Sequence, residues 1–207
     1  MKDNRVVFDS LLHTGGARFG AAFKADDVRF RAEGSLSFTF LDCETALVNY
    51  IVDGIGGDQS VTRLTHPAGH GCGQANPVPK TDLTGSWFDP ERNGEGFVIQ
   101  QLDEGRALVY WFTYDDEGRQ GWMFNTGSIA GNQITFPDLR KTSGGHFGRS
   151  YLPGDIAQEP WGSLVLELDC DGGTARWHRL HSTDSAGRQN LVRLSHLQNS
   201  GCLANRH

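Results

Sequence analysis

The sequence predicts an all-β protein whose strands form an antiparallel meander and close into a barrel or pack as a sandwich. Its 207 residues include 27 glycines and only 7 prolines, and runs of strong helix formers are short. This composition is typical of short strands joined by many turns. In many short runs, apolar residues alternate with polar ones, as they do in strands that bury one face. An internal repeat, present in one and a half copies, arranges these runs in two matching blocks.

Turn residues separate the predicted strands. The segments at 103–105 (DEG), 115–118 (DDEG) and 171–173 (DGG) supply the positive φ and the local hydrogen bonds of hairpin turns. We therefore expect each strand to pair antiparallel with the next. The expected strands are 5–9, 18–23, 35–41, 46–52 and 59–65 in the first block, and 84–88, 96–102, 106–114, 119–125, 132–136, 146–151, 163–169, 174–180 and 189–196 in the second.

The expected strand over 106–114 is apolar on both of its faces. One face carries Leu108, Tyr110, Phe112 and Tyr114, and the other carries Val109, Trp111 and Thr113. Such a strand is either buried on both sides, or buried on one side and exposed on the other as an aromatic platform.

The repeat is visible when the chain is compared with itself. Residues 4–8 (NRVVF) match residues 132–136 (NQITF), and Gly15-Gly16 with Phe19-Gly20 matches Gly144-Gly145 with Phe147-Gly148. Further matches follow in the same order: residues 34–36 with 162–164, Cys43 with Cys170, residues 63–66 with 193–196, and Cys72 with Cys202.

These matches predict three parts of the chain. Residues 1–74 form a half copy, residues 75–80 a linker and residues 81–204 a complete copy. The stretch 81–131 has no counterpart in the first block, so the first copy lacks its front half. A half copy must cover its strand edges, either against the complete copy or against a second chain in a homodimer.

The four cysteines fall two in each copy, which predicts the disulfides Cys43–Cys72 and Cys170–Cys202. Four cysteines allow three connectivities, and four reduced thiols in a cytosolic protein are the alternative. A closed loop of this length contributes about 3–4 kcal/mol on the chain-entropy model. Disulfides persist in oxidising compartments, so we expect a periplasmic or extracellular protein.

Charge and hydropathy exclude several partners. The formal net charge is −6 and no cluster of Lys and Arg stands out, so nucleic acid is not expected as a partner. No run approaches the roughly 18–20 apolar residues of a membrane helix, and residues 1–5 carry no apolar signal core. Together with a start inside a repeat, this suggests a piece of a longer exported protein or a reading frame that begins within a gene.

One set of motifs resembles a known kind of sequence. The run G85-S-W-F-D-P with Gly94, Gly96 and Phe97 is followed by W111-F-T-Y-D, G144-G-x-F-G and W161-G, and each block closes with R-L-[TS]-x6-C. This set resembles a module repeated in uncharacterised exported proteins of proteobacteria, over nearly the whole chain. The resemblance implies export and a β architecture, and no activity.

Aromatic residues are the candidates for ligand binding. A concave face that includes Trp87, Tyr110, Trp111, Tyr114 and Trp122 is expected to hold a glycan or another small ligand, because flat rings offer large apolar contacts. The alternative is that these rings pack in the core.

Histidines and carboxylates are the candidates for catalysis. His66 and His196 occupy matching positions in the two blocks. Either could act as a general base, and the alternative is that both recur because the repeat needs them for packing. Asp89 and Glu95 lie in a glycine-containing loop. They are either a general acid/base pair or solvated residues of a surface turn. His146 lies close to a serine and a threonine in one loop and is a further candidate.

A divalent metal ion is the one candidate cofactor that the sequence suggests. His66 and His70 stand four residues apart in a loop with Pro67 and Gly69, so both rings can meet at one ion. No third ligand is identifiable, and the chain has no Cys-x-x-Cys pair of the kind found in zinc ribbons.

Three functions remain open. The first is an exported ligand-binding or surface module for a glycan or small molecule. The second is a hydrolase of esters or phosphoesters that uses a His/carboxylate or metal site, although the chain has no Gly-x-Ser-x-Gly elbow. The third is a structural assembly repeat whose half copy completes itself by dimerisation.

Overall fold

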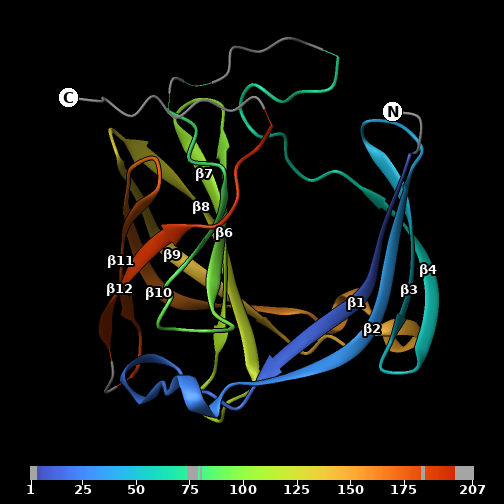
Figure 1. Cartoon of the computed structure of the whole chain (residues 1–207), viewed down its shortest axis with the longest axis horizontal. Coiled ribbons are helices and arrows are strands. Elements are labelled where there is room, and N and C mark those ends of the chain that lie inside the picture. Colours follow the sequence, from blue (N-terminus) through green and yellow to red (C-terminus); the bar gives the residue numbers. More distant parts are fainter. Residues whose placement is uncertain (1–3, 74–78, 80, 183–184, 199–207) are drawn as a thin grey trace.

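The protein folds into two antiparallel β-sheets (Figure 1). The computed structural model describes residues 4–73, 79, 81–182 and 185–198. Within this part of the chain, every regular element is a strand or a single 3-10 turn, and no helix is long and apolar enough to span a membrane. The predicted all-β class is confirmed, and the meander closes as a barrel.

Eight strands form a closed barrel in which each strand pairs with the next and the last pairs with the first. The ring closes where Val192 lies opposite Phe88 and Arg193 opposite Trp87. Closure leaves no strand edge free. The barrel strands are β5 (Gly85–Phe88), β6 (Gly96–Leu102), β7 (Arg106–Tyr114), β8 (Gln120–Ala130), β9 (Gln133–Ser143), β10 (Ala157–Leu168), β11 (Gly172–Arg179) and β12 (Ala186–Arg193).

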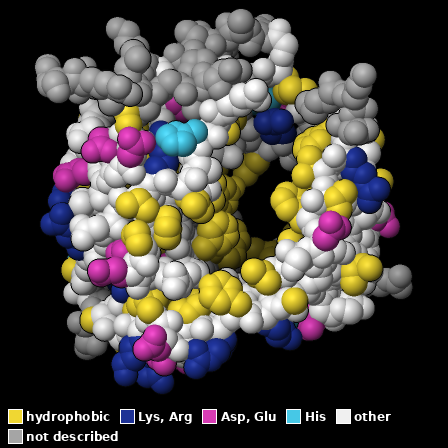
Figure 2. Space-filling view, in the orientation of Figure 1, with side chains coloured by type: hydrophobic (Ala, Val, Ile, Leu, Met, Phe, Trp, Pro, Cys, Tyr) yellow, Lys and Arg dark blue, Asp and Glu magenta, His cyan; other side chains and the backbone are white. Residues whose placement is uncertain are grey.

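The other four strands form a separate sheet beside the barrel. Its order is β1-β2-β3-β4, so the described pairings leave β1 and β4 as its edges. Figure 2 shows an open hollow between sheet and barrel, with hydrophobic side chains along both of its sides. The strands are β1 (Arg5–Gly15), β2 (Arg29–Phe40), β3 (Thr45–Val52) and β4 (Ile55–Thr62).

Apolar side chains fill the inside of the barrel. The alternation along each strand turns every second residue inward, where these side chains are almost fully buried. The interior is therefore a packed core. Its largest members are Trp87, Phe97, Ile99, Val109, Trp111, Ile134, Phe136, Leu139, Leu164, Leu166 and Leu168.

A side chain from the first block completes this core. Phe19 is 5% exposed, and its ring centre lies 5.5–5.8 Å from those of Trp111, Trp161 and Trp177. The backbone around it bonds to the turn between β7 and β8, because the Gly16 N–H donates to the Gly118 carbonyl at 2.8 Å. The segment between β1 and β2 thus closes one end of the barrel.

The predicted strands 18–23 and 146–151 are wrong. Each region instead holds one short 3-10 turn and is followed by a second, because glycines with positive φ, including Gly16 (φ 100°) and Gly144 (φ 81°), break the extended chain. A Cβ at either glycine would clash with a carbonyl oxygen, that of Asp27 or Asp155. The turns are η1 (Gly20–Ala22), η2 (Ala25–Asp27), η3 (Gly148–Ser150) and η4 (Pro153–Asp155).

The same glycines refine the predicted alignment of the two blocks. Gly16 and Gly144 both have a positive φ, and a Cβ on either would clash with a backbone carbonyl oxygen. Gly16 also precedes Phe19 by the same number of residues as Gly144 precedes Phe147. The match therefore pairs Gly16 with Gly144, one residue away from the Gly15-Gly16 and Gly144-Gly145 pairing expected from the sequence.

One predicted disulfide lies within the described residues. Cys43 and Cys72 are bonded, with Cα atoms 5.8 Å apart, and the bond ties the β2–β3 turn to the chain that follows β4. Cys170 is also disulfide-bonded, while Cys202 lies outside the described residues. The predicted linker 75–80 lies outside them as well, apart from residue 79.

Candidate functional site

Four aromatic rings form a continuous patch on the outer wall of the barrel, which we call the aromatic wall: Tyr110 and Phe112 of β7, and Trp122 and Phe124 of β8. Phe112 lies opposite Trp122, and Tyr110 opposite Phe124, in adjacent strands. Cross-strand pairing holds the rings close, with centres 5.3–6.5 Å apart and planes inclined by 19–40°. The patch therefore presents four adjacent rings on one side of the barrel wall.

The aromatic wall is open to a ligand. Phe112 is 43% exposed and Trp122 39%, and Tyr110 and Phe124 are half-buried beside them. Large aromatic side chains gathered on a surface mark places where another molecule binds. The strand alternation explains why they gather here, because the intervening residues Val109, Trp111 and Met123 point into the core.

A cavity of about 700 Å³ adjoins this wall at one end of the barrel. Trp122 and Phe19 supply apolar surface, and Lys141, Thr142 and Ser143 supply polar groups. Such a mixture suits a ligand that has both apolar faces and hydroxyl groups.

The cations around the cavity are matched by carboxylates. Arg179 donates two hydrogen bonds to Asp116, at 2.9 and 2.8 Å, and Lys141 lies 3.0 Å from Glu159. The Arg179 hydrogen bonds hold the pKa of Asp116 below its ordinary value. With its charges already paired, the cavity is suited to a neutral ligand rather than to an anion.

The structure divides the predicted ligand-binding residues into two groups. Tyr110 and Trp122 belong to the aromatic wall. Trp87, Trp111 and Tyr114 are at most 1% exposed and lie outside the wall, although Tyr114 also lines the adjoining cavity. Burial raises the pKa of Tyr114, whose hydroxyl donates to the Asn93 carbonyl at 3.3 Å. The wall instead gains Phe112 and Phe124.

The two predicted carboxylates hold local structure. Glu95 is 6% exposed and accepts hydrogen bonds from Arg92 (2.7 Å), Thr113 (2.8 Å) and Gln189 (2.9 Å). A carboxylate with three donors is fully occupied and joins β6, β7 and β12. Asp89 accepts from the Glu91 N–H at 3.0 Å, as a turn residue does.

The three histidines predicted as catalytic lie in different parts of the structure. His66 Nε2 is 3.2 Å from a Glu44 carboxylate oxygen, near the Cys43–Cys72 disulfide. His146 lines a second cavity with Tyr50, Phe147 and others, and His196 is exposed beyond β12.

A metal site at His66 and His70 remains a prediction. In the described part of the chain, three potential ligand residues converge only at Cys43, Glu44 and Cys72, and the two cysteines are already bonded to each other. Neither histidine belongs to that group.

Three residues of the site were missing from the predicted ligand-binding set: Phe112, Phe124 and Phe19. Phe112 lies on the same face of its strand as Tyr110. Phe124 follows the same outward alternation as Trp122, and that period could have added it to the ligand-binding set. The burial of Phe19 could not be predicted from a local pattern, because the residues that it contacts lie far away in the sequence. Only the three-dimensional structure brings it to Trp111.

The fold and site define a class: β-barrel proteins with a packed interior and an aromatic patch on the outer wall. No family, curated protein or solved structure matches this chain. Its function is therefore inferred from the residues and their geometry.

Proposed function

We propose that this protein is an exported binding module that holds a glycan, or another neutral ligand with an apolar face, on the aromatic wall. The observation that carries the proposal is the set of four adjacent, partly exposed rings on β7 and β8, whose planes are inclined to one another by 19–40°. Sugar rings have apolar faces that stack on aromatic rings, while their hydroxyls need hydrogen-bond partners. Lys141, Thr142 and Ser143 of the adjoining cavity supply such partners.

The filled barrel supports a surface site over an internal one. Barrels of this strand number hold a ligand inside only when their interior is left empty, and here side chains fill it. The predicted hydrolase has less support, because the described candidate residues are dispersed and Glu95 is engaged with three neighbours.

Isothermal titration against a panel of neutral and acidic oligosaccharides tests the proposal. We expect binding to at least one glycan, weakened tenfold or more by Phe112→Ala, since tenfold corresponds to about 1.4 kcal/mol, the scale of one lost ring contact. The matched control is Phe30→Ala, which removes a ring that is 59% exposed in β2. Equal affinity of the two variants, or no heat with any glycan, contradicts the proposal.

The disulfides support export to the periplasm or the cell exterior. Cys43 is bonded to Cys72, and Cys170 is also bonded. Structural disulfides persist where the surroundings are oxidising. Labelling of free thiols in protein recovered from its native compartment is expected to find none, and full labelling would contradict this placement.

A further inference from the structure

The sheet β1–β4 has the same internal plan as the second half of the barrel, β9–β12. Both are four-stranded meanders with the same pairing order, and their inward-facing residues match row by row. The first row, Val6-Phe38-Val48-Gln59, corresponds to Ile134-Leu166-Ala175-Gln189. The second row, Phe8-Leu36-Tyr50-Gly57, corresponds to Phe136-Leu164-Trp177-Gly187.

One detail shows that the match extends to packing. In each sheet a glycine leaves room for the aromatic ring opposite it: a Cβ at Gly57 would clash with the Tyr50 ring, and one at Gly187 with the Trp177 ring. In the barrel this arrangement lays Trp177 over the core. The inner face of the sheet β1–β4 thus carries the same pattern of side chains as the inner face of β9–β12 in the barrel.

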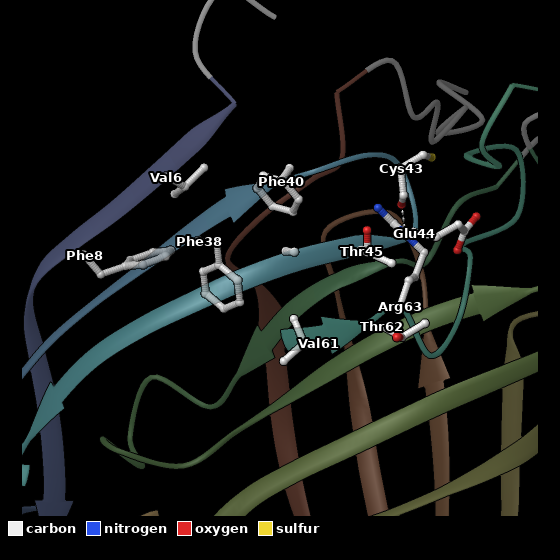
Figure 3. A pocket seen from close by; sticks show the side chains of 11 residues that line it. Val6, Phe8, Phe38, Phe40, Cys43, Glu44, Thr45, Val61, Thr62 and Arg63 are labelled. Carbon is white, nitrogen blue, oxygen red and sulfur yellow. Dashed lines mark hydrogen bonds between the residues drawn. The ribbon is translucent and has the colours of Figure 1, made fainter. Parts of the chain in front are cut away.

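The two sheets differ in what covers them. Ile134 and Phe136 are fully buried, because β5–β8 close over them. Their counterparts Val6 and Phe8 are 43% and 46% exposed. They line an open cavity of about 360 Å³ together with Phe38, Phe40 and Val61, and Figure 3 shows these side chains on one side of the sheet.

The strand edges differ in the same way. In the barrel, β9 pairs with β8 and β12 with β5, so four strands bridge the two edges. The described pairings of β1 and β4, the counterparts of β9 and β12, leave one edge of each strand open. An occupant that satisfies both edges brings four antiparallel strands, as β5–β8 do.

Phe147 gives an independent indication of this occupant. It matches Phe19 in sequence, and its ring centre lies 5.1 Å from that of Tyr50, just as the Phe19 ring lies 5.8 Å from Trp177. Phe19 is buried because Trp111 of β7 covers its other side. Phe147 is 56% exposed, since none of the described strands covers it as β7 covers Phe19.

We propose that the inner face of β1–β4 is a docking surface for a four-stranded antiparallel segment of the β5–β8 kind, which closes the sheet into a second eight-stranded barrel around Phe147. The hollow beside the sheet, with its hydrophobic sides, is the space that such a segment enters (Figure 2). The occupant has aromatic residues at alternate positions on one face, as residues 81–131 of this chain do.

The test extends the full chain by placing a second copy of residues 81–131 directly before Asn4. In the barrel, Gly131 and Asn132 join β8 to β9, and Asn4 matches Asn132, so the graft reproduces that turn. Hydrogen exchange of the β1 and β4 amides is then compared between the extended and the unextended chain. Amides of β1 and β4 are expected to gain protection from hydrogen exchange.

A control substitution makes the result specific. Phe38→Asp in the extended chain places a charge on the inner face and is expected to restore rapid exchange in β1 and β4. Protection of β11, which does not contact this face, shows in the same experiment that the original barrel is folded. If the fused chain does not fold, residues 81–131 are added as a separate polypeptide while the unextended chain refolds. Light scattering then measures the molar mass of the product.

Two results would overturn the proposal. One is an extended chain, or a refolded mixture, in which β1 and β4 exchange as fast as in the unextended protein. The other is an unextended chain that is a dimer by light scattering and that Phe38→Asp converts to a monomer, because the face would then serve a second copy of this chain.

Discussion

At the scale of single residues, two phenylalanines at matching positions have opposite surroundings. Phe19 packs among three tryptophans of the barrel, while Phe147 touches Tyr50 and is largely exposed. The difference arises because one of the two sheets is closed and the other is open.

Phe19→Ala is expected to lower the free energy of unfolding by about 3–5 kcal/mol, because it leaves a cavity in a packed core. Phe147→Ala is the matched control and is expected to change it by about 0.5 kcal/mol or less, as exposed substitutions do. Urea titration followed by tryptophan fluorescence measures both, since all five tryptophans lie in residues 81–204. Equal effects would contradict the role of Phe19 as the end of the core.

The ion pair of Asp116 and Arg179 predicts a dependence on pH. The Arg179 hydrogen bonds lower the pKa of Asp116 in the folded state, so its contribution to stability is present above the ordinary pKa, near 3.8, and is lost as the pH falls through the folded value. Asp116→Asn is expected to lower the melting temperature slightly at neutral pH, since the carboxylate is 58% exposed.

Melting temperatures of both proteins between about pH 2 and pH 7 check this sign. The two curves are expected to converge below the ordinary pKa of Asp116. A difference that grows as the pH falls would show that the ion pair is not its cause.

At the scale of elements, the disulfide and the open edges govern the sheet β1–β4. Cys43–Cys72 closes a loop with a sequence separation of 29 residues that contains β3 and β4. Replacing both cysteines by serine is expected to destabilise the sheet by about 3–4 kcal/mol through the entropy of the unfolded chain. Limited proteolysis within β1–β4 measures the loss, while unchanged tryptophan fluorescence shows that the barrel is intact.

The two sheets offer a matched comparison of strand protection. β3 and β11 are both eight residues long and central in their sheets, yet only β11 belongs to a closed barrel. Amides of β3 are expected to exchange at least about tenfold faster, a difference of about 1.4 kcal/mol in opening free energy. Equal rates in mass-spectrometric exchange would mean that the open sheet is as well supported as the barrel.

The alternation and the turn residues predicted most strands, because both act within a few neighbouring residues. The hairpin turns at 103–105 and 115–118 lie where they were expected, and β6 and β7 match their predicted ranges. The turn predicted at 171–173 instead covers 169–171, because Gly172 and Gly173 already pair with β12 as the start of β11. Strand ends were less well predicted: β1 and β9 run several residues further, since pairing with a neighbouring strand extends them beyond their own apolar pattern.

At the scale of the whole molecule, one sheet closes into a barrel and the other stays open. The complete barrel has no free edge and a filled interior, whereas the sheet beside it leaves aromatic side chains exposed. The proposed ligand site lies on the outer wall of the barrel, and the proposed docking surface lies on the inner face of the sheet. Phe112→Ala and Phe38→Asp therefore test the two proposals separately.

The sequence by itself determined the β class, the hairpin turns at 103–105 and 115–118 and the Cys43–Cys72 pairing. The class and the turns depend on local pattern, and the pairing depends on how the cysteines are distributed along the chain. Only the tertiary structure decided which aromatic residues are exposed. Trp111 and Phe112 are neighbours in one strand, and closure of the barrel buries one and exposes the other. Closure depends on pairings between distant strands, such as β12 with β5, which no local pattern encodes.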